Sequence, residues 1–354
     1  MSVEMGGEVS NLIVDLSIVL ASLLYSHGVG KFFVQGTTRF LVLFPVIYLF
    51  LCLPLNLQTV FFAGPTSFFI SWLGSFKLIL YAFGRGPLSS YPPLPLSHFI
   101  ATASLPIKIL KNEETPSHQT TKKSKIDYAP RVLLFIFVTR AYGYKDYLPP
   151  LLTMSFLAYY FIFLLIQFLA LLAFLVRTLL GVKLEPQFDE PHHATSVQNF
   201  WGKRWNLMVS DILRPAVYNP ARAIFSHFVP ERWVSVPAVL VTFLVSGIMH
   251  EFILYHLGQV TPTWEMTWFF IVHGLCVGTE IVIKKTTGQR FEQRPVVAWL
   301  LTLTFITFTS FWLFFPPFLR LDPCSRICRE VMAFVGFLKH GHLVGPNEHS
   351  CPFT

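Results

Sequence analysis

The chain has 354 residues, of which 53% are hydrophobic and only 13% are charged. A soluble domain carries about 25% charged residues, so this composition excludes an ordinary soluble protein. A membrane β-barrel would alternate apolar and polar residues, and the long run Leu148–Val176 does not alternate. The formal net charge of +8 does not indicate a nucleic-acid partner, because basic residues of membrane proteins gather in cytoplasmic loops beside anionic lipid.

The apolar segments predict the fold class. A helix needs roughly 20 apolar residues to cross a bilayer. We therefore expect an all-α, polytopic membrane bundle of about seven or eight transmembrane helices. The candidate spans, in chain order, are Leu12–Tyr25, Phe40–Leu55, Val60–Phe83, Leu148–Val176, Val234–Leu257, Trp264–Ile283 and Val296–Leu319, with a shorter apolar segment at Arg131–Tyr144. We expect Gly64–Pro65 to interrupt the third span, because proline lacks a backbone N–H.

The hydrophilic segments predict the orientation. Residues 84–130, 177–233 and 284–295 are rich in lysine and arginine, whereas 258–263 contain neither. Basic loops face the cytoplasm, so we place all three there; this requires 131–176 to cross the membrane twice or to dip in and return. We treat 1–354 as one membrane-embedded domain, with 84–130 a partly disordered loop and 320–354 a tail.

The loop 177–233 contains a predicted amphipathic helix at 196–213. Thr195 and Gln198 read as a capping box, and the helix should stop before Pro215. One face carries an apolar stripe at helical spacing, formed by Trp201, Trp205, Met208 and Ile212. Such a helix is either an anchor at the membrane interface or the wall of an active site. Lys203 and Arg204 would then meet a polyanionic substrate.

His250 is the most informative residue of the chain, because it lies inside the apolar span Val234–Leu257. Ionisable residues within a membrane are costly and usually mark a functional site. Ser246 shares its helical face, whereas Glu251 points about 100° away. A neutral imidazole is the state that a general base needs. The alternative is a structural histidine satisfied by a neighbour; we prefer that interpretation for His273 in the next span.

Motifs for other chemistry are absent from the sequence. It has no Gly-x-Ser-x-Gly elbow, Walker loop, His-Glu-x-x-His or dinucleotide fingerprint. The tail holds Cys324, Cys328 and Cys351 near three histidines, but the spacing matches no standard zinc site. We therefore expect no metal, and either free thiols or one disulfide in the tail. A buried base without a protein nucleophile suits direct acyl transfer to a hydroxyl.

Two motifs together resemble the membrane-bound O-acyltransferase superfamily, and its plant wax synthase branch in particular. They are Phe200-Trp201-Gly202-Lys203-Arg204-Trp205-Asn206 and Ser246-Gly247-Ile248-Met249-His250-Glu251. The segments 68–90 and 207–220 also fit the branch, so the resemblance covers nearly the whole chain. Lys203 and Arg204 stand where larger animal members carry an acidic residue and a second tryptophan.

The resemblance implies a helical bundle enclosing an intramembrane tunnel, in the endoplasmic reticulum. His250 matches the catalytic histidine of the family, and Asn206 matches its second active-site residue. Acyl-CoA and a lipid alcohol would be the substrates, without a bound cofactor, and Trp205, Lys203, Arg204 and Ser246 would contact them. An oxyanion donor such as Asn206 is worth roughly 2.7–4 kcal/mol.

Three functions remain open on the sequence. The first is a long-chain-alcohol O-fatty-acyltransferase that forms wax esters. The second keeps the reaction but takes a sterol or another lipid hydroxyl as the acceptor. The third is a transporter with His250 in a proton path; it would be expected to show internal repeats, and we detect none. The sequence sets no oligomeric state.

Overall fold

The protein is described by a computed structural model that covers residues 5–110, 133, 137, 140, 147–288 and 294–340. The chain forms two compact units: unit 1 comprises 1–106, 186–352 and 354, and unit 2 comprises 107–185 and 353. Every regular element of the described residues is a helix, apart from one isolated bridge between Ile109 and Leu184 in unit 2. The all-helical fold is as predicted.

Six helices among the described residues are long and apolar enough to cross a membrane: Gly6–Phe32, Thr37–Asn56, Ile162–Leu180, Ser235–Gly258, Glu265–Thr287 and Pro295–Leu319. Each overlaps a predicted span. Four of them correspond to the single helices α1 (Met5–Phe32), α7 (Pro150–Leu180, in unit 2), α11 (Ser235–Gly258) and α12 (Glu265–Thr287). The second span combines α2 (Thr37–Cys52) with η1 (Leu53–Asn56). The last span combines α13 (Pro295–Thr309), η8 (Ser310–Phe314) and α14 (Phe315–Leu319). The protein is therefore a multi-pass membrane protein. The short segment 131–144 lies largely outside the described residues.

The third predicted span is one continuous helical run, formed by α3 (Val60–Thr66), η2 (Ser67–Gly74) and α4 (Ser75–Ala82). The predicted interruption at Gly64–Pro65 is wrong. Pro65 lies inside the helix, and the turns directly after it widen into the π-helix η2. A π-helix re-pairs the backbone at i→i+5, so the run absorbs a proline without ending. The smaller helix α5 (Leu96–Ser104) follows.

The predicted helix at 196–213 is wrong as a single element. It is divided into α8 (Val197–Asn199), η6 (Phe200–Arg204) and α9 (Leu207–Leu213), separated by a corner at Trp205 and Asn206. Asn206 has a left-handed backbone, with φ 42°. The N-cap is Ser196, not Thr195, and its Oγ accepts from the Asn199 N–H at 3.0 Å. The predicted stop before Pro215 is also wrong, since η7 (Arg214–Tyr218) and α10 (Asn219–Phe225) continue.

The corner forms because other segments take over the hydrogen bonds of its backbone. The Leu207 N–H donates to the Gln187 carbonyl at 2.9 Å, and the Asp189 N–H donates to the Arg204 carbonyl at 2.9 Å. These two bonds pair 187–189 with 204–207 and replace the i→i−4 bonds of a continuous helix. The short η5 (Pro191–His193) lies just after this pairing.

Buried carboxylates cap α3 where it begins. Glu8 accepts from the Gln58 and Thr59 N–H groups, and Glu330 accepts from the Val60 and Phe61 N–H groups at 2.8 and 2.9 Å. Glu330 belongs to α15 (Pro323–His340), and burial raises its pKa. Three of the four N–H groups that a helix start leaves unpaired, those of Thr59, Val60 and Phe61, are thereby satisfied.

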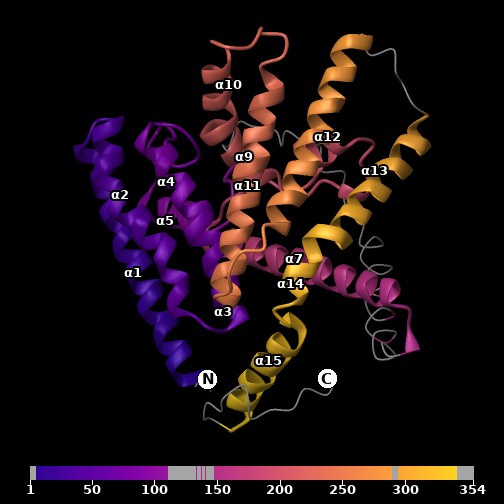
Figure 1. The fold of residues 1–354 in the computed structure, drawn as a ribbon. Coiled ribbons are helices and arrows are strands. Elements are labelled where there is room, and N and C mark those ends of the chain that lie inside the picture. Colours follow the sequence, from indigo (N-terminus) through magenta and orange to yellow (C-terminus); the bar gives the residue numbers. More distant parts are fainter. Residues whose placement is uncertain are drawn as a thin grey trace. The chain divides into compact units, whose positions relative to one another are not determined.

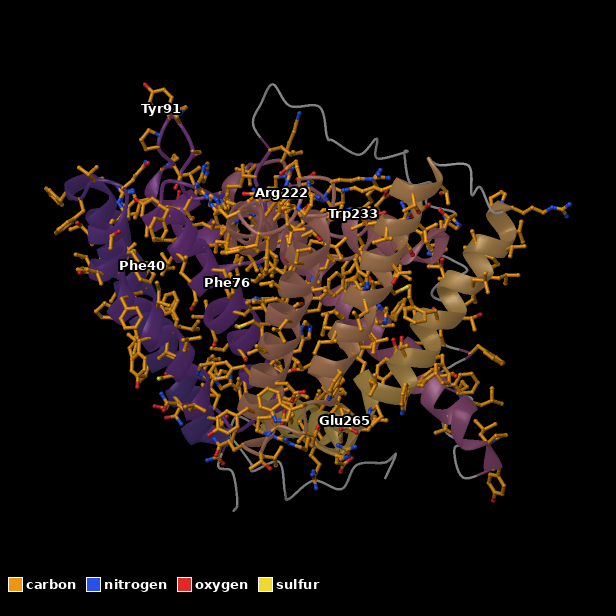
Figure 2. The ribbon with its side chains drawn as sticks, turned by 45° about the horizontal axis from the view of Figure 1, so that its top comes forward. Phe40, Phe76, Tyr91, Arg222, Trp233 and Glu265 are labelled. Atoms are coloured by element: carbon orange, nitrogen blue, oxygen red, sulfur yellow. The ribbon has the colours of Figure 1, made fainter. Side chains whose placement is uncertain are left out.

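The two ends of unit 1 are formed by different segments of the chain. Tyr91, Arg222 and Trp233 lie at one end and Glu265 at the other (Figure 2). Tyr91 of the predicted basic loop 84–130 and Arg222 and Trp233 of the predicted basic loop 177–233 therefore share an end of unit 1, as the predicted orientation requires. The assignment of that end to the cytoplasm stays a prediction.

α11 and α12 run side by side and pack closely through small residues (Figure 1). A Cβ at Gly247 would lie 2.8 Å from the Thr267 Cα, and one at Gly274 would lie 3.0 Å from the Phe243 Cβ. Small residues allow membrane helices to approach in this way. Gly247 thus brings α12 against α11, beside the turn that carries His250.

This packing predicts that Gly247→Ala destabilises the protein. The added methyl group meets a backbone atom, so the helices must separate, at a cost of about 1–3 kcal/mol. Gly28→Ala is the matched control, because nothing lies within 4 Å of a Cβ at that position in α1. The thermal midpoint of detergent-solubilised protein should fall for Gly247→Ala and not for Gly28→Ala. Equal midpoints would contradict the close approach.

Candidate active site

His250 is fixed in one orientation and one tautomer by its own helix. Its Nδ1 lies 2.7 Å from the Ser246 carbonyl oxygen, one turn earlier in α11. A carbonyl can only accept, so Nδ1 carries the proton and the Nε2 of the neutral ring presents its lone pair. Nε2 has no hydrogen-bond partner among the described residues.

Three aromatic rings surround this imidazole. The ring centroids of Trp72, Phe270 and Phe314 lie 5.1, 4.4 and 6.1 Å from that of His250. Trp72 belongs to the π-helix η2 and Phe314 to the π-helix η8. π-Helical turns frequently occur at functional sites. His250 itself is only partly buried.

Two buried histidines of α11 and α12, His256 and His273, differ from His250, because both nitrogens of each are bonded. His256 accepts from the Ser67 hydroxyl at 2.6 Å and donates to the Leu51 carbonyl at 3.1 Å. His273 accepts from the Trp201 indole N–H at 2.9 Å and lies 2.8 Å from the Thr309 hydroxyl. His273 is thus satisfied by its neighbours, as predicted. Of these three rings, only His250 has a nitrogen left for another molecule.

Asn206 occupies the corner before α9 and caps that helix. Its Oδ1 accepts from the Val209 N–H at 3.4 Å. The side-chain NH₂ then remains as a donor, and it has no partner among the described residues. Asparagine is one of the few residues that tolerate a left-handed backbone. The corner therefore explains why asparagine stands there, and it leaves the amide able to donate.

The segments that carry Asn206 and His250 pack against common neighbours. Met208 and Ile212 of α9 pack with Leu73 and Leu80, in the same helical run as Trp72. The ring centroid of Trp201 in η6 lies 5.6 Å from that of Phe270, and the Phe270 ring contacts the His250 ring. Two independent packing routes in unit 1 thus connect these segments.

Sequence reasoning missed how η6 attaches to the bundle. The periodicity predicts that Trp201 belongs to an apolar stripe, whereas in the structure its indole N–H donates a hydrogen bond to His273 Nδ1. Glu280 forms an ion pair with Lys284 at 3.6 Å. Glu280 also accepts from the Val197 and Gln198 N–H groups at 2.8 and 3.2 Å and thereby caps α8. The sequence contains an indication of this contact, because a carboxylate at the end of a span is a candidate cap for the start of another helix.

The four predicted substrate-contacting residues lie in different settings. The Arg204 guanidinium donates to the Asn199 side chain at 2.7 Å and to the Asp189 and Glu190 carbonyls. Lys203 is exposed and makes no ion pair or hydrogen bond within the described part of the chain. Trp205 stacks on Phe200 with ring centroids 5.4 Å apart. Ser246 is buried and offers its carbonyl to His250.

Glu251 lies apart from the imidazole. Its Oε1 accepts from the Thr267 N–H at 3.2 Å, in the first turns of α12. The side chain is buried, with 3% of its residue surface exposed. This placement agrees with the divergence of about 100° expected for the next residue of a helix, and it makes Glu251 part of the α11–α12 contact.

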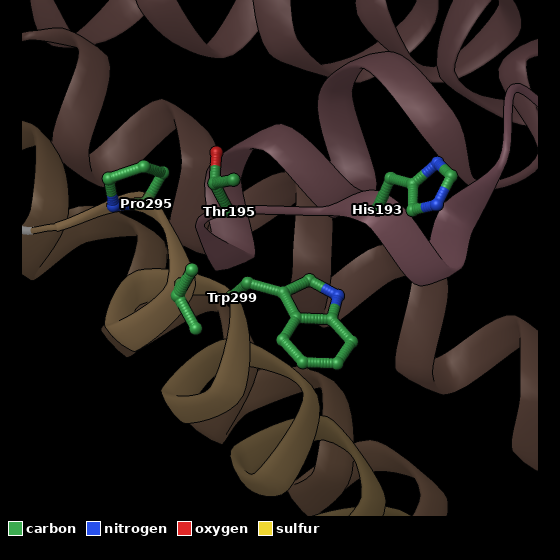
Figure 3. Close-up of a pocket in the computed structure, with 5 residues that line it drawn as sticks. His193, Thr195, Pro295 and Trp299 are labelled. Atoms are coloured by element: carbon green, nitrogen blue, oxygen red, sulfur yellow. The ribbon is translucent and has the colours of Figure 1, made fainter.

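A shallow groove of about 260 Å³ lies where the 193–195 segment meets the start of α13 (Figure 3). Its lining residues are His193, Thr195, Pro295, Val296 and Trp299. The Trp299 N–H donates to the His192 carbonyl at 2.6 Å, so this contact attaches the loop to α13. None of the groove residues contacts His250.

The cysteines and possible metal ligands add no further site to the described residues. Cys52 and Cys276 are free and partly buried, and Cys328 takes part in a disulfide. No group of three or more histidine, cysteine, aspartate or glutamate side chains within 5–110, 147–288 and 294–340 is arranged to hold a metal ion.

The fold and the site define a class of protein: a multi-pass helical membrane protein with a histidine in one span whose Nε2 is unbonded, and an asparagine at the corner of an adjoining loop. Residues 184–272, which include both, match the membrane bound O-acyl transferase family. The chain is 41% identical to the probable long-chain-alcohol O-fatty-acyltransferase 3 of Arabidopsis thaliana, over 95% of this chain and 98% of that protein.

Two further relatives cover most of the chain. Acyl-CoA–sterol O-acyltransferase 1 of Arabidopsis thaliana is 40% identical over 90% of this chain and 94% of that protein. The long-chain-alcohol O-fatty-acyltransferase of Simmondsia chinensis is 40% identical over 80% and 82%, respectively. The chain belongs to the membrane-bound O-acyltransferase family. It is an enzyme, an acyltransferase, and the transporter alternative is set aside.

The contacts of Arg204 predict a structural effect for its removal. Hydrogen bonds to charged groups contribute roughly 1.5–3 kcal/mol, so Arg204→Ala should lower the thermal midpoint of the purified protein. Lys203→Ala is the adjacent control and should leave the midpoint unchanged. An unchanged midpoint for Arg204→Ala, with a raised KM for acyl-CoA, would instead assign the guanidinium to substrate.

Proposed function

We propose that this enzyme transfers a fatty acyl group from acyl-CoA to the hydroxyl of a long-chain alcohol and forms a wax ester in the endoplasmic reticulum membrane. The observation that carries the proposal is the unpaired Nε2 of His250 inside a membrane span. The long-chain-alcohol O-fatty-acyltransferases among its relatives support the choice of substrates.

The chemistry follows from the tautomer. His250 Nε2 accepts the proton of the alcohol hydroxyl, and the alcohol oxygen attacks the thioester carbonyl carbon. A C–O bond forms, the C–S bond breaks, and the imidazolium returns its proton to the leaving thiolate. The Nδ1–H bond to the Ser246 carbonyl holds the ring throughout and supports the positive charge that it carries between the two transfers.

Asn206 supplies a hydrogen-bond donor for the thioester oxygen, a role that His250 as the base does not fill. The thioester oxygen becomes negatively charged during the attack, and an amide N–H is a suitable donor to it. Because the Oδ1 of Asn206 is already engaged with Val209, its NH₂ is the end that is available. Lys203 is exposed on the preceding turn and is available for the phosphates of coenzyme A.

The first experiment removes the base. His250→Ala should abolish ester formation in microsomes while the amount of folded protein is maintained. His256→Ala is the control, because that ring has both nitrogens bonded to protein and is expected to affect stability more than chemistry. Full activity of His250→Ala would refute the assignment of the base.

The second experiment tests Asn206 without breaking its corner. Asn206→Asp keeps the capping oxygen and a side chain that tolerates the left-handed backbone, but it loses the NH₂ donor. The rate should fall by about 10²–10³, with little change in thermal midpoint. A variant that retains more than half of the wild-type kcat would exclude the oxyanion role.

A second acceptor is supported by the acyl-CoA–sterol O-acyltransferase among the relatives, at 40% identity. Labelled acyl-CoA supplied to microsomes with a panel of long-chain alcohols and sterols decides between the two. We expect labelled wax ester as the main product. Labelled sterol ester in its place would reassign the acceptor and leave the roles of His250 and Asn206 unchanged.

A further inference from the structure

Trp201, His273 and Thr309 form a hydrogen-bonded series that joins three elements of unit 1. The Trp201 N–H in η6 donates to His273 Nδ1 in α12 at 2.9 Å. Nδ1 therefore accepts, and His273 Nε2–H donates to the Thr309 hydroxyl at the end of α13 at 2.8 Å. Thr309 in turn donates to the Phe305 carbonyl at 2.8 Å. His273 is fully buried and Thr309 is 3% exposed.

Trp201 also contacts the two segments that carry the proposed catalytic residues. Its carbonyl accepts from the Ser210 hydroxyl at 3.0 Å, and Ser210 lies on α9, the helix that Asn206 caps. Its ring lies 5.6 Å from Phe270, whose ring lies 4.4 Å from His250. Trp201 thus contacts the Asn206 segment through its backbone carbonyl and the wall of the His250 site through its ring.

We propose that Trp201 and His273 are positioning residues for acyl transfer: their hydrogen bond sets the Asn206 corner in register with His250. This inference rests on the functions proposed above for His250 and Asn206. Asn206 stands on a loop and His250 on a span, so no covalent or helical geometry fixes the distance between them. A directed, buried hydrogen bond between η6 and α12 supplies that constraint.

The hydrogen bond does what packing alone cannot. Trp201 also packs on Phe243 and Phe269, and such contacts tolerate small sliding movements because dispersion is not directional. The N–H···N bond requires a distance near 3 Å and a nearly linear approach. Loss of the N–H therefore allows the end of η6 that leads to Asn206 to shift against α12, while the Glu280 bonds still hold α8 and most apolar contacts remain.

The test uses Trp201→Phe, which keeps an aromatic ring and removes the N–H. A displacement of about 1 Å at a reacting group can cost up to about 100-fold in rate. We expect kcat to fall by roughly 10- to 100-fold, with KM for acyl-CoA changed less than about twofold. The assay uses the full-length protein in microsomes or detergent, with acyl-CoA and the acceptor that the substrate panel selects.

Trp299→Phe is the matched control. Its N–H also attaches the loop to a membrane helix, through the His192 carbonyl at 2.6 Å, but it contacts neither α9 nor Phe270 in the described residues. It should therefore lower stability without a selective loss of kcat. A loss of kcat in Trp299→Phe that equals the loss in Trp201→Phe would overturn the proposal.

A double-mutant cycle with Asn206→Asp separates positioning from stability. If the bond acts by placing Asn206, Trp201→Phe should cost little further rate once the Asn206 donor is gone. If the bond only stabilises the fold, the same fold-loss should appear in both backgrounds, and the proposal fails. Rescue gives a second criterion: His273→Gln can accept from Trp201 and donate to Thr309, and it should retain more activity than His273→Leu.

These outcomes are distinguishable from failure of the proposed function. If His250→Ala remains active, the base assignment fails and the positioning proposal fails with it. If His250→Ala is inactive while Trp201→Phe keeps the wild-type kcat, only the positioning proposal fails.

Discussion

The bond between His250 Nδ1 and the Ser246 carbonyl is the constraint on which the chemistry of this protein depends. An imidazole in a membrane span has two tautomers, and only the form protonated at Nδ1 offers Nε2 as a base. The bond at 2.7 Å selects that form within a single helical turn. It costs no buried charge, so the residue can remain in an apolar setting without an ionic partner.

The packing of α11 against α12 brings a residue of α12 beside the helical turn that carries His250. Gly247 lets the Thr267 backbone approach, which brings Phe270 against the imidazole. π-Helical turns in two other segments contribute Trp72 and Phe314. A helix that changes its pitch can direct bulky side chains to one point where a regular helix would direct them around its circumference. The aromatic surroundings of His250 thus arise from irregularities in helices that are otherwise ordinary membrane spans.

The sequence was a good guide to the spans and to His250, for the same reason. Apolar length sets where helices cross, and an ionisable residue within such a run is costly enough to be conspicuous. It was a poorer guide to 196–213, because the periodicity of that segment predicts one amphipathic helix. The family motif singles out Asn206; nothing in its local pattern separates it from Asn199 in the same predicted helix. The break at Trp205 depends on Gln187 and Asp189, which share no period with it.

The amino-acid sequence by itself determined that this is a helical membrane protein of the acyltransferase family, with a histidine inside an apolar span. These properties follow from composition, from local spacing and from motifs that can be read along the chain. Only the tertiary structure decided which ring nitrogens of His250, His256 and His273 are bonded, that Arg204 holds the loop, and that Glu280 bonds α8 while His273 bonds η6. Hydrogen bonds between distant segments are set by how helices pack, and helix packing leaves no periodic trace in the sequence of either partner.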